Sequence, residues 1–506
     1  MPRSWLRVAG VAAILPVLAG ASFSSDGASA PLQVEGRLVI ASELPEPPTL
    51  DIRASGSTAI AQLLIYNVQE TLVQLDGAGR FRPLLAESWR VSPNRRTYTF
   101  KLRRGVRFHD GSAFTSGDVV YSFKTAKTNP ASPQAGRFAV VEFVKARGPR
   151  AVQVTLKRPS FRFLYDMAQR AGVIVSGKTA GQAASHPIGT GPFKFERWNR
   201  GSSIVLSRFA GYWGRKARLD AVEMRYIADP NAQVNALLAG DIDVLSNLRA
   251  PDRAAQLRAN TSFTFIRGAT NAKQQLSINV SKPPLNNLRV RQAIAYAIDR
   301  RAVNVATFGG FGTLTGTFAA RTDPYFTTYA PYPYNPAKAR DLLSRAGFSG
   351  GLDLEIKSIR GNISAPQAEV VAAQLGRVGI RAKITELDFA TWASTVFNPS
   401  VANFQLTTVG HSQLLEIYQF VSPPGWYQQY RSTGFNRLMT AADSAADLTT
   451  FTRLARRAAM RLADDAVTIP FFAESTVTFV RKRVIGWPVT GRIDASIDLR
   501  AVRVAP

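Results

Sequence analysis

Apolar and polar residues alternate strictly at residues 97–102, which read TYTFKL. A period of two is typical of a strand with one buried face, so this segment is predicted to be a strand. Val106 and Phe108 continue the alternation and predict a second strand, and Asp110-Gly111 predicts the turn that ends it. The pattern therefore indicates two neighbouring strands early in the chain.

Capping residues predict where helices begin and end. Thr115 stands three residues before Asp118, the spacing of a capping box, and predicts a helix that starts directly after Thr115. Asp229 and Pro230 have the residue types of an N-cap and a first helical residue, and Gly240 is typical of a helix end. Both helices follow predicted strands.

Strands and helices alternate along the rest of the chain. Further strands are predicted at residues 37–41, 220–227, 242–245, 276–280, 352–356, 382–385 and 476–480. Further helices are predicted after Leu288, between Asn335-Pro336 and Gly347, and at 367–378. This order predicts α/β sheets with right-handed crossovers. Because 506 residues are too many for one ordinary core, two or three domains are expected.

The N-terminus has the pattern of an export signal at residues 1–21. Arg3 and Arg7 precede the apolar segment 8–18, which is too short to span a bilayer, and 19–21 has the small residues of a cleavage site. The chain has no cysteine, which excludes disulfides and a lipid anchor on cysteine. We therefore expect an exported protein of the Gram-negative periplasm, with its signal peptide cleaved and no integral membrane segment in the mature chain.

The net charge of +28 raises the hypothesis of nucleic-acid binding. Basic residues nevertheless occur singly or in pairs, and this distribution argues against that partner. In the predicted helix 449–464 the apolar residues lie apart from one basic face, which holds Arg453, Arg456, Arg457 and Arg461. Such a face is first a solvated surface, and weak attraction to the anionic inner-membrane surface is a second role.

Two short motifs lie within the strand–turn–helix region, ESW at 87–89 and FHDG at 108–111. In this setting they resemble the signature of the bacterial extracellular solute-binding proteins of family 5, which are peptide, nickel and opine receptors of ABC importers. The resemblance recurs in family order at residues 188–193 (IGTGPF), 230–244, 282–300 and 334–348 (which contains NPAKARDLLSRAGF). It therefore covers nearly the whole mature chain.

The resemblance implies a fold and domain boundaries. The implied fold is the α/β type II periplasmic binding protein fold of the cluster C kind, with a hinge near 265–269 and 469–472. Lobe I is expected at 31–268 with an extra subdomain at about 61–184, lobe II at 269–469, and 470–506 returns to lobe I. A ligand is expected to lie between the lobes, which close on it.

The sequence lacks the parts of common enzymes. It has three histidines, and turn geometry explains the neighbourhoods of His109 and His186, whereas His411 stands apart from any such turn motif. It carries no HExxH motif and no residues with metal-ligand spacing. We therefore expect no enzyme activity, no catalytic residue, no metal site and no cofactor.

Residues 407–419 read TTVGHSQLLEIYQ, where peptide-binding relatives typically carry a W-x-x-D-Y-x-D-P block. In those relatives an aspartate in or near this block binds the α-ammonium of the peptide, because a desolvated cation needs a charged partner. Here Glu416 is the only acid between residues 401 and 430. The difference argues against ordinary di- or oligopeptide binding.

Two explanations of this difference stay open. In the first, Glu416 or another acid such as Glu43 or Glu474 binds the cation of an amino-acid-like ligand. In the second, the ligand has no free ammonium, as in an opine, a sugar derivative or another modified metabolite. The polar groups of such a ligand are then bound by His411, Ser412 and Gln413.

Aromatic residues complete the predicted ligand site, because an aromatic ring stacks on a ligand and keeps a hydrogen-bonding edge. Glu43 and Leu44 join them, since relatives bring backbone groups to the ligand after the first strand. Glu70, by contrast, is expected on a solvated helix face. The full predicted set is Glu43, Leu44, Trp392, His411, Ser412, Gln413, Glu416, Trp426 and Tyr427.

The leading hypothesis is a periplasmic, monomeric subunit that binds a small organic solute and delivers it to an inner-membrane ABC permease. A sensory receptor that presents its ligand to a signalling partner is the first alternative. A secreted hydrolase is the second alternative, and the lack of a catalytic constellation argues against it.

Overall fold

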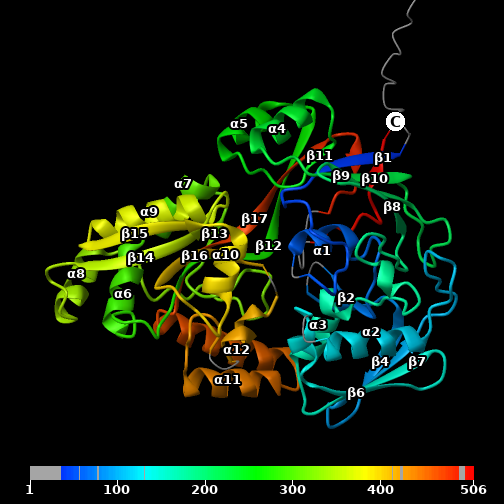
Figure 1. Ribbon diagram of the computed structural model, residues 1–506, viewed down its shortest axis with the longest axis horizontal. Helices are drawn as coiled ribbons and strands as arrows, with labels where there is room; N and C mark the ends of the chain where they lie inside the picture. Colours follow the sequence, from blue (N-terminus) through cyan, green and yellow to red (C-terminus); the bar gives the residue numbers. More distant parts are fainter. Residues whose placement is uncertain are drawn as a thin grey trace, which may run out of the picture. The chain divides into compact units, whose positions relative to one another are not determined.

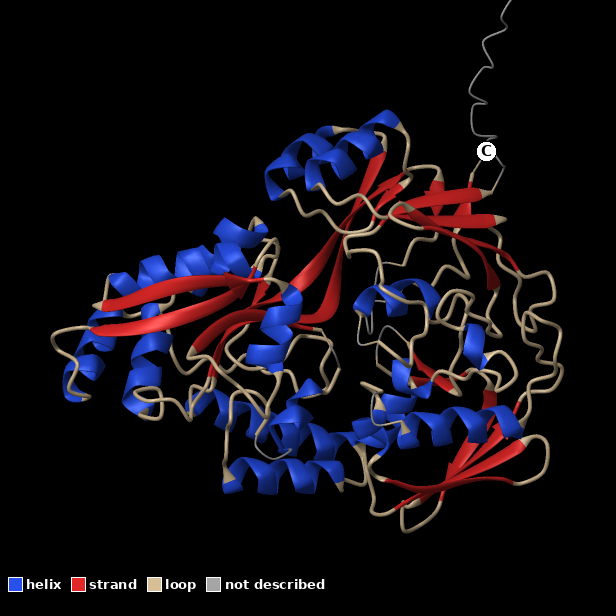
Figure 2. Cartoon of the chain, in the orientation of Figure 1, coloured by secondary structure: helices blue, strands red, loops and turns tan. Residues whose placement is uncertain are grey.

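An eleven-stranded sheet runs through the described chain, and its strands are red in Figure 2. The path is β15-β14-β16-β12-β17-β11-β1-β10-β9-β8, and β13 pairs with β17 beside it. In that order the strands are β15 (Ile380–Leu387), β14 (Leu352–Ile359), β16 (Leu406–His411), β12 (Phe263–Ile278), β17 (Thr468–Arg481), β11 (Val244–Leu245), β1 (Arg37–Ala41), β10 (Ala221–Arg225), β9 (Ser203–Arg208), β8 (Phe193–Asn199) and β13 (Thr313–Leu314).

The computed structural model describes residues 36–55, 57–76, 79–129, 132–412, 414–421, 425–488 and 496–505. The predicted export signal at 1–21 and the predicted ligand residue Gln413 lie outside these ranges. The chain from Glu35 to Pro506 forms one compact unit. None of the described helices combines the length and the apolar character that a bilayer crossing requires.

β12 and β17 are the longest described strands and pair antiparallel along nearly their whole length. The ladder runs from Phe263↔Arg481 to Ser277↔Thr468, with irregularities after Ala269 and after Gln274. Figure 1 shows these two strands side by side between the two ends of the large sheet. Both predicted hinge segments fall within this pair, while the lobe boundaries stay a prediction.

β1 lies between β10 and β11 and is parallel to both. The predicted strand at 37–41 is confirmed, and the continuous apolar run fits a strand covered on both faces. The predicted ends of helix α4 (Pro230–Ala239) are also confirmed. The Asp229 side chain accepts a hydrogen bond from the Ala232 N–H at 2.6 Å, and Gly240 has φ 96°, which favours glycine.

A separate four-stranded sheet carries the strictly alternating segment. Its order is β4 (Ala86–Val91), β5 (Thr97–Leu102), β7 (Ala151–Leu156) and β6 (Val141–Ala146). β5 confirms the predicted strand, and helix α2 (Ser116–Thr128) follows it. The Thr115 N–H donates to Asp118 Oδ2 at 2.8 Å and the Thr115 hydroxyl accepts from the Gly117 N–H at 3.2 Å, so the predicted capping box is confirmed.

The strand predicted at Val106 and Phe108 is wrong. The Phe108 N–H donates to the Ser112 carbonyl at 2.8 Å, and the only pairing here is one bridge between Arg107 and Ala113. Val106 and Phe108 are nevertheless 3% and 0% exposed. The alternation therefore predicted correctly that both side chains are buried. A tight turn buries them here, without the hydrogen-bonded pairing of a strand.

Helices accompany the end of the large sheet where β14 and β15 run parallel (Figure 1). They are α6 (Leu288–Ala297), α7 (Arg300–Phe308), α8 (Pro336–Arg345) and α9 (Ser364–Gly376). The three helices predicted in this region are confirmed, with α9 beginning three residues earlier than expected. Asn335 caps α8 by accepting from the Lys338 N–H at 2.9 Å.

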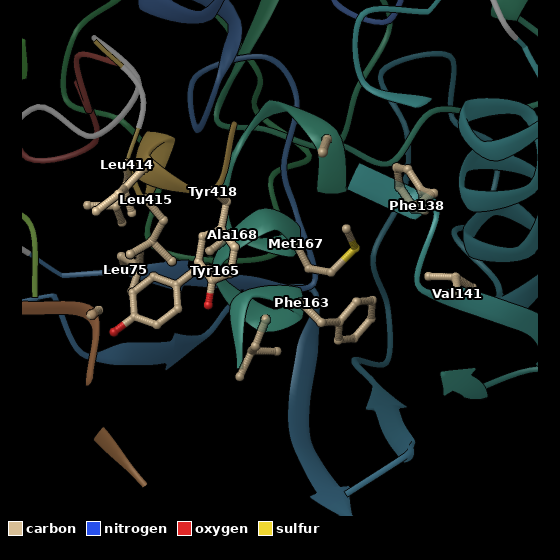
Figure 3. Packing of buried hydrophobic residues seen from close by; sticks show 14 of the residues in the cluster. Leu75, Phe138, Val141, Phe163, Tyr165, Met167, Ala168, Leu414, Leu415 and Tyr418 are labelled. Carbon is tan, nitrogen blue, oxygen red and sulfur yellow. The ribbon is translucent and has the colours of Figure 1, made fainter. Parts of the chain in front are cut away.

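Two helices that contact each other, α11 (Thr433–Asp443) and α12 (Leu448–Asp464), follow β16 in the chain. The predicted faces of α12 are confirmed, because its four arginines are exposed, Phe451, Ala458 and Leu462 are buried, and Leu454 is half-buried. A single hydrophobic cluster joins this region to the four-stranded sheet. Figure 3 shows part of it, with Leu414, Leu415 and Tyr418 near Leu75 and Tyr165.

Short elements complete the described chain. They are α1 (Thr58–Leu64), β2 (Val73–Leu75), β3 (Phe81–Pro83), η1 (Ala135–Phe138), α3 (Arg162–Met167), η2 (Arg170–Gly172), η3 (Ala180–Gln182), η4 (Pro251–Arg253), α5 (Ala254–Ala259), α10 (Phe389–Trp392), η5 (Ala393–Phe397), η6 (Glu416–Val421), β18 (Val484–Ile485) and β19 (Arg503–Val504).

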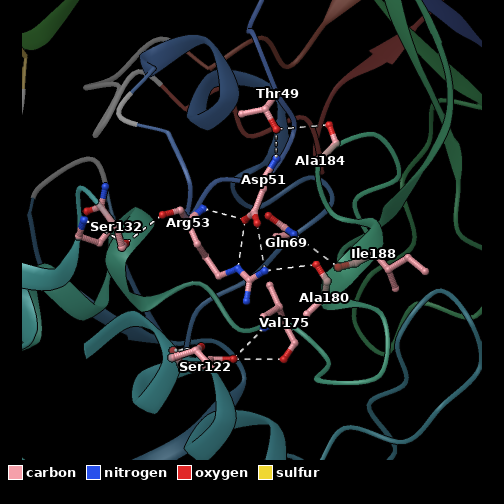
Figure 4. Close-up of polar contacts among 12 residues, drawn as sticks. Thr49, Asp51, Arg53, Gln69, Ser122, Ser132, Val175, Ala180, Ala184 and Ile188 are labelled. Carbon is pink, nitrogen blue, oxygen red and sulfur yellow. Dashed lines mark hydrogen bonds and ion pairs between the residues drawn. The ribbon is translucent and has the colours of Figure 1, made fainter. Parts of the chain in front are cut away.

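An ion pair anchors the segment that follows the proline-rich turn (Figure 4). Arg53 Nε lies 3.1 Å from Asp51 Oδ1, and the same guanidinium donates to the Ala180 carbonyl. The Ser132 hydroxyl donates to the Arg53 carbonyl at 2.9 Å. These bonds hold residues 51–53 against loops more than seventy residues further along the chain.

Candidate functional site

Glu43 stands two residues after the end of β1, in a half-buried position. The Gln62 side-chain amide donates to Glu43 Oε2 at 2.8 Å, and the Ser246 hydroxyl donates to the same oxygen. The Glu43 N–H donates to Ser246 Oγ at 3.3 Å, and the Leu44 N–H donates to Ser42 Oγ at 3.0 Å. The carboxylate of Glu43 is therefore held in a fixed direction by donors from α1 and from the residues after β11.

A second group gathers His411, Glu416 and Tyr427. His411 Nδ1 lies 3.3 Å from Glu416 Oε1, and His411 Nε2 lies 2.8 Å from the Tyr427 hydroxyl. The Tyr427 hydroxyl also lies 2.9 Å from Ser277 Oγ on β12. Burial raises the pKa of Tyr427 far above its ordinary value, so this phenol stays protonated. Both ring nitrogens of His411 are thus engaged within the protein.

Aromatic rings surround this group. The rings of Trp426 and His411 lie 4.6 Å apart, and Phe397 lies between them and Trp392, 5.4 Å from the latter. The Trp392 indole N–H donates to Thr407 Oγ1 at 3.0 Å. Trp392, Trp426 and Tyr427 are 3%, 6% and 0% exposed. In this conformation Trp426 and Tyr427 pack against each other, and Phe397 lies in contact with both of them and with Trp392. The role of these three predicted aromatics as ligand contacts stays a prediction.

The sequence reasoning missed a buried ion pair beside this group. Lys273 Nζ lies 3.3 Å from Asp323 Oδ2, and both side chains are 0% exposed. Lys273 stands opposite His411 in the β12–β16 ladder, and its ammonium lies 5.2 Å from the ring of Phe318. Burial raises the pKa of Asp323, and the charge of Lys273 opposes this rise. No local pattern signals a contact between residues fifty positions apart.

Glu474, the third candidate acid, lies on β17 and is 9% exposed. It accepts a hydrogen bond from the Gln274 side-chain amide at 2.5 Å, and Gln274 lies on β12. Thr270 Oγ1 donates to the Glu474 carbonyl at 3.0 Å. Glu474 therefore belongs to the β12–β17 seam. Of the remaining predicted residues, Ser412 is half-buried, and Gln413 lies outside the described ranges.

The predicted solvation of Glu70 is wrong, because Glu70 is 0% exposed. Helix α1 ends at Leu64, so Glu70 is not on a helix face. Its carboxylate accepts hydrogen bonds from Thr190 at 2.9 Å, Tyr212 at 2.8 Å and Trp213 at 3.0 Å. Burial outweighs these three bonds and raises the pKa of Glu70 to about 7.

His109 and His186 line one surface pocket, together with Asp110 and Lys194. The Gly189 N–H donates to His109 Nδ1 at 3.3 Å, and His109 Nε2 lies 3.0 Å from the Gly191 carbonyl. Burial lowers the pKa of His109 to about 4, so this ring is neutral and structural. Within the described ranges, no three or more His, Asp or Glu side chains are grouped to hold a metal ion.

Comparisons with known proteins decide the family. The sequence model of the bacterial extracellular solute-binding proteins, family 5, matches residues 80–425. The glutathione-binding protein GsiB of Escherichia coli O1:K1 / APEC is 30% identical over 356 residues, which are 69% of this chain and 69% of that protein. The chain belongs to family 5 of the bacterial extracellular solute-binding proteins. The predicted family is confirmed.

Solved structures of this family share the fold. The periplasmic binding protein DppA from Helicobacter pylori, in complex with the peptide STSA, has a TM-score of 0.81, with 25% identity over 93% of this chain and 98% of that one. The binding protein AgaA from A. tumefaciens R10, in complex with agropinic acid, has a TM-score of 0.80, with 24% identity over 93% and 99%. The predicted α/β type II periplasmic binding protein fold is therefore confirmed.

Proposed function

We propose that this chain is the periplasmic subunit of an ABC importer that binds a small organic solute with an amino group and delivers it to an inner-membrane permease. Family membership supports the transport role. Relatives that bind glutathione, the peptide STSA and agropinic acid support a small organic solute as the cargo.

The observation that carries the choice of ligand is the setting of Glu43. Its carboxylate is half-buried, and Gln62 and Ser246 hold it in one direction. A carboxylate in this setting suits an ammonium group, because charge-assisted hydrogen bonds are the strong ones in a partly dry site. Glu43 therefore takes the role that the aspartate of peptide-binding relatives has, and Glu474 offers a second acid on the β12–β17 seam.

The alternative ligand without an ammonium group receives less support. It depends on His411 as a hydrogen-bonding partner, yet His411 is 4% exposed and its ring nitrogens face Glu416 and Tyr427. Glu416 is 7% exposed beside this histidine. These side chains stabilise the loop around them in the described conformation, and binding through them requires that loop to open.

The proposed mechanism is binding with closure about the β12–β17 pair. A ligand that contacts groups on both sides of this hinge stabilises the closed arrangement by its difference in affinity for the two states. The permease then recognises the closed form. No bond in the ligand needs to be made or broken, so the purified protein is expected to leave its ligand intact.

Thermal shift and calorimetry against glutathione, the peptide STSA and an opine test this proposal. A bound solute should raise the free energy of unfolding by about 2.7 kcal/mol at a hundredfold excess over Kd. Glu43→Gln should weaken binding of an amine-bearing solute by about 1.5–3 kcal/mol, tenfold or more. Native mass spectrometry of protein purified without refolding identifies a retained solute.

The matched control is Glu196→Gln, which removes an exposed carboxylate on β8. It should bind like the parent protein. A Glu43→Gln variant with unchanged affinity would contradict the role of Glu43, and a lack of any stabilising solute would contradict the transport role. Hydrolysis of a solute during these measurements would favour the enzyme alternative. Sequencing the N-terminus of protein recovered from the periplasm tests the export signal.

A further inference from the structure

Helix α12 presents a row of exposed arginines. Arg453, Arg456 and Arg457 are exposed, and among the described residues no acid lies within ion-pair distance of any of them. Their spacing of three and four residues places them on one face of the helix. Arg461 extends the row by one turn and is paired with Asp465 at 2.9 Å.

The opposite face fixes the orientation of this row. Phe451, Ala455, Ala458 and Leu462 are each 0% exposed, so α12 cannot rotate about its axis without losing that burial. The arginines are therefore held outward by the fold. A mobile basic tail would lose conformational freedom on binding, which weakens binding. The arginines of α12 avoid most of this cost, because the helix is already fixed.

Two acids near this face make contacts of their own. Asp447 caps α12 by accepting from the Thr450 N–H at 2.8 Å, and this bond, with a smaller contribution from the charge of Arg453, lowers the pKa of its carboxyl. Asp443, at the end of α11, is 4% exposed and accepts from Arg158 and Ser160 of the four-stranded region. Positive charge also continues on the neighbouring segment, where Arg431 and Arg437 are exposed.

We propose that the arginine face of α12 (Arg453, Arg456 and Arg457) docks on an anionic phospholipid surface. Guanidinium groups pair well with phosphate oxygens, and a charged bilayer needs no matching pocket on the protein. Leu448, at the first residue of α12, is 52% exposed and places an apolar side chain at the edge of the same helix. Docking would concentrate this subunit next to a membrane-embedded partner.

The charge of the whole chain favours the same partner. A net charge of +28 attracts any anionic surface, but the spread of single and paired basic residues does not form the continuous track that a nucleic-acid strand follows. An anionic bilayer attracts all basic residues that lie near its surface, and each arginine close to it raises the affinity about fivefold. Three arginines then contribute about a hundredfold.

Vesicle sedimentation tests this inference on the purified exported protein. Vesicles of phosphatidylcholine with phosphatidylglycerol should bind the protein at low salt and release it at about 0.5 M NaCl, whereas pure phosphatidylcholine vesicles should not bind it. The triple variant Arg453→Gln, Arg456→Gln, Arg457→Gln should lose about a hundredfold in partitioning. Its unfolding midpoint should stay that of the parent, because all three side chains are exposed.

The matched control removes the same charge elsewhere, through Arg90→Gln, Arg104→Gln and Arg218→Gln at exposed positions. It should lose less than about fivefold, as expected for charges that do not face the surface. Equal loss in both triple variants would overturn the inference in favour of diffuse attraction. Binding to DNA in preference to the vesicles, or binding that needs reconstituted permease, would also overturn it. Each of these outcomes leaves solute binding untouched, so the two proposals fail separately.

Discussion

Phe161 stacks on Phe451, with ring centroids 4.2 Å apart and an interplanar angle of 10°. The first residue precedes α3 and the second lies on α12, so the contact joins the region predicted as the extra subdomain of lobe I to the region predicted as lobe II. Arg162 adds a cation–π contact over the ring of Tyr418, at 5.1 Å. The described conformation therefore has the two regions in contact on the side away from the β12–β17 pair.

Asp443 is the polar centre of this contact. It accepts from Ser160 Oγ at 2.8 Å, from the Arg162 N–H at 3.2 Å and from Arg158. Asp443→Ala leaves the buried Ser160 hydroxyl and the Arg162 N–H without this acceptor, so we expect a loss of about 1–3 kcal/mol in the free energy of unfolding. Small-angle scattering should also show a larger radius of gyration, because the contact between the two regions weakens.

The control for Asp443 is Asp353→Ala, since Asp353 is an exposed acid paired with Arg381 at the sheet end. Its radius of gyration should equal that of the parent, and its stability should change by less than about 0.5 kcal/mol. An Asp443→Ala protein with unchanged scattering would show that the aromatic packing alone holds the two regions together.

Lys273 and Asp323 give a second prediction. Lys273→Met leaves Asp323 buried without its counter-charge, and breaking a buried pair in this way costs about 3–5 kcal/mol. The double variant Lys273→Met, Asp323→Leu removes both charges and should recover most of this loss. Urea unfolding of the parent, both single variants and the double variant measures the coupling. A double variant as unstable as Lys273→Met would contradict the expected pairing.

The capping box at Thr115 gives a third. Thr115→Ala removes the side-chain acceptor at the start of α2, and such a change costs about 1 kcal/mol. Thr128→Ala, at the other end of the same helix, is the control, because Thr128 is exposed and its hydroxyl only donates to the Lys124 carbonyl. Thermal unfolding should show a lower midpoint for the first variant than for the second.

Local signals in the sequence predicted the elements well. Residues 97–102 and 37–41 are strands and Thr115 and Asp229 cap helices, because the pattern that decides each of them lies within a few positions. The wrong prediction of a strand at Val106 and Phe108 also comes from relying on a local pattern. Two buried residues at spacing two suit both a strand and a tight turn, and the sequence carries no local signal that separates them there.

Long-range contacts decided what the sequence could not predict. Glu70 is buried because Thr190, Tyr212 and Trp213 converge on it from more than a hundred residues away. Lys273 lies on β12, and its partner Asp323 is fifty residues further along the chain. Within the candidate site, the structure brings His411, Glu416, Trp426 and Tyr427 together, and the described contacts place Glu43 in a different group. The family resemblance predicted the type of site. Which acids a ligand can contact depends on the long-range packing, which the sequence does not show.

The fourth prediction concerns the buried Glu70 and the pH dependence of the free energy of unfolding. The pKa of its carboxyl is about 7 in the folded chain, against an ordinary value of 4.5, so the folded state holds this proton more tightly than the unfolded state. Protonation of Glu70 therefore contributes to the free energy of unfolding. This contribution is fully present below pH 4.5 and is lost as the pH rises toward 7, with a total of about 3 kcal/mol. Glu70→Gln cannot ionise and should flatten this part of the stability profile, even though its amide offers Tyr212 and Trp213 a poorer acceptor. Urea unfolding of both proteins between pH 4.5 and 8 measures the difference, and parallel profiles would show that Glu70 does not titrate in this range.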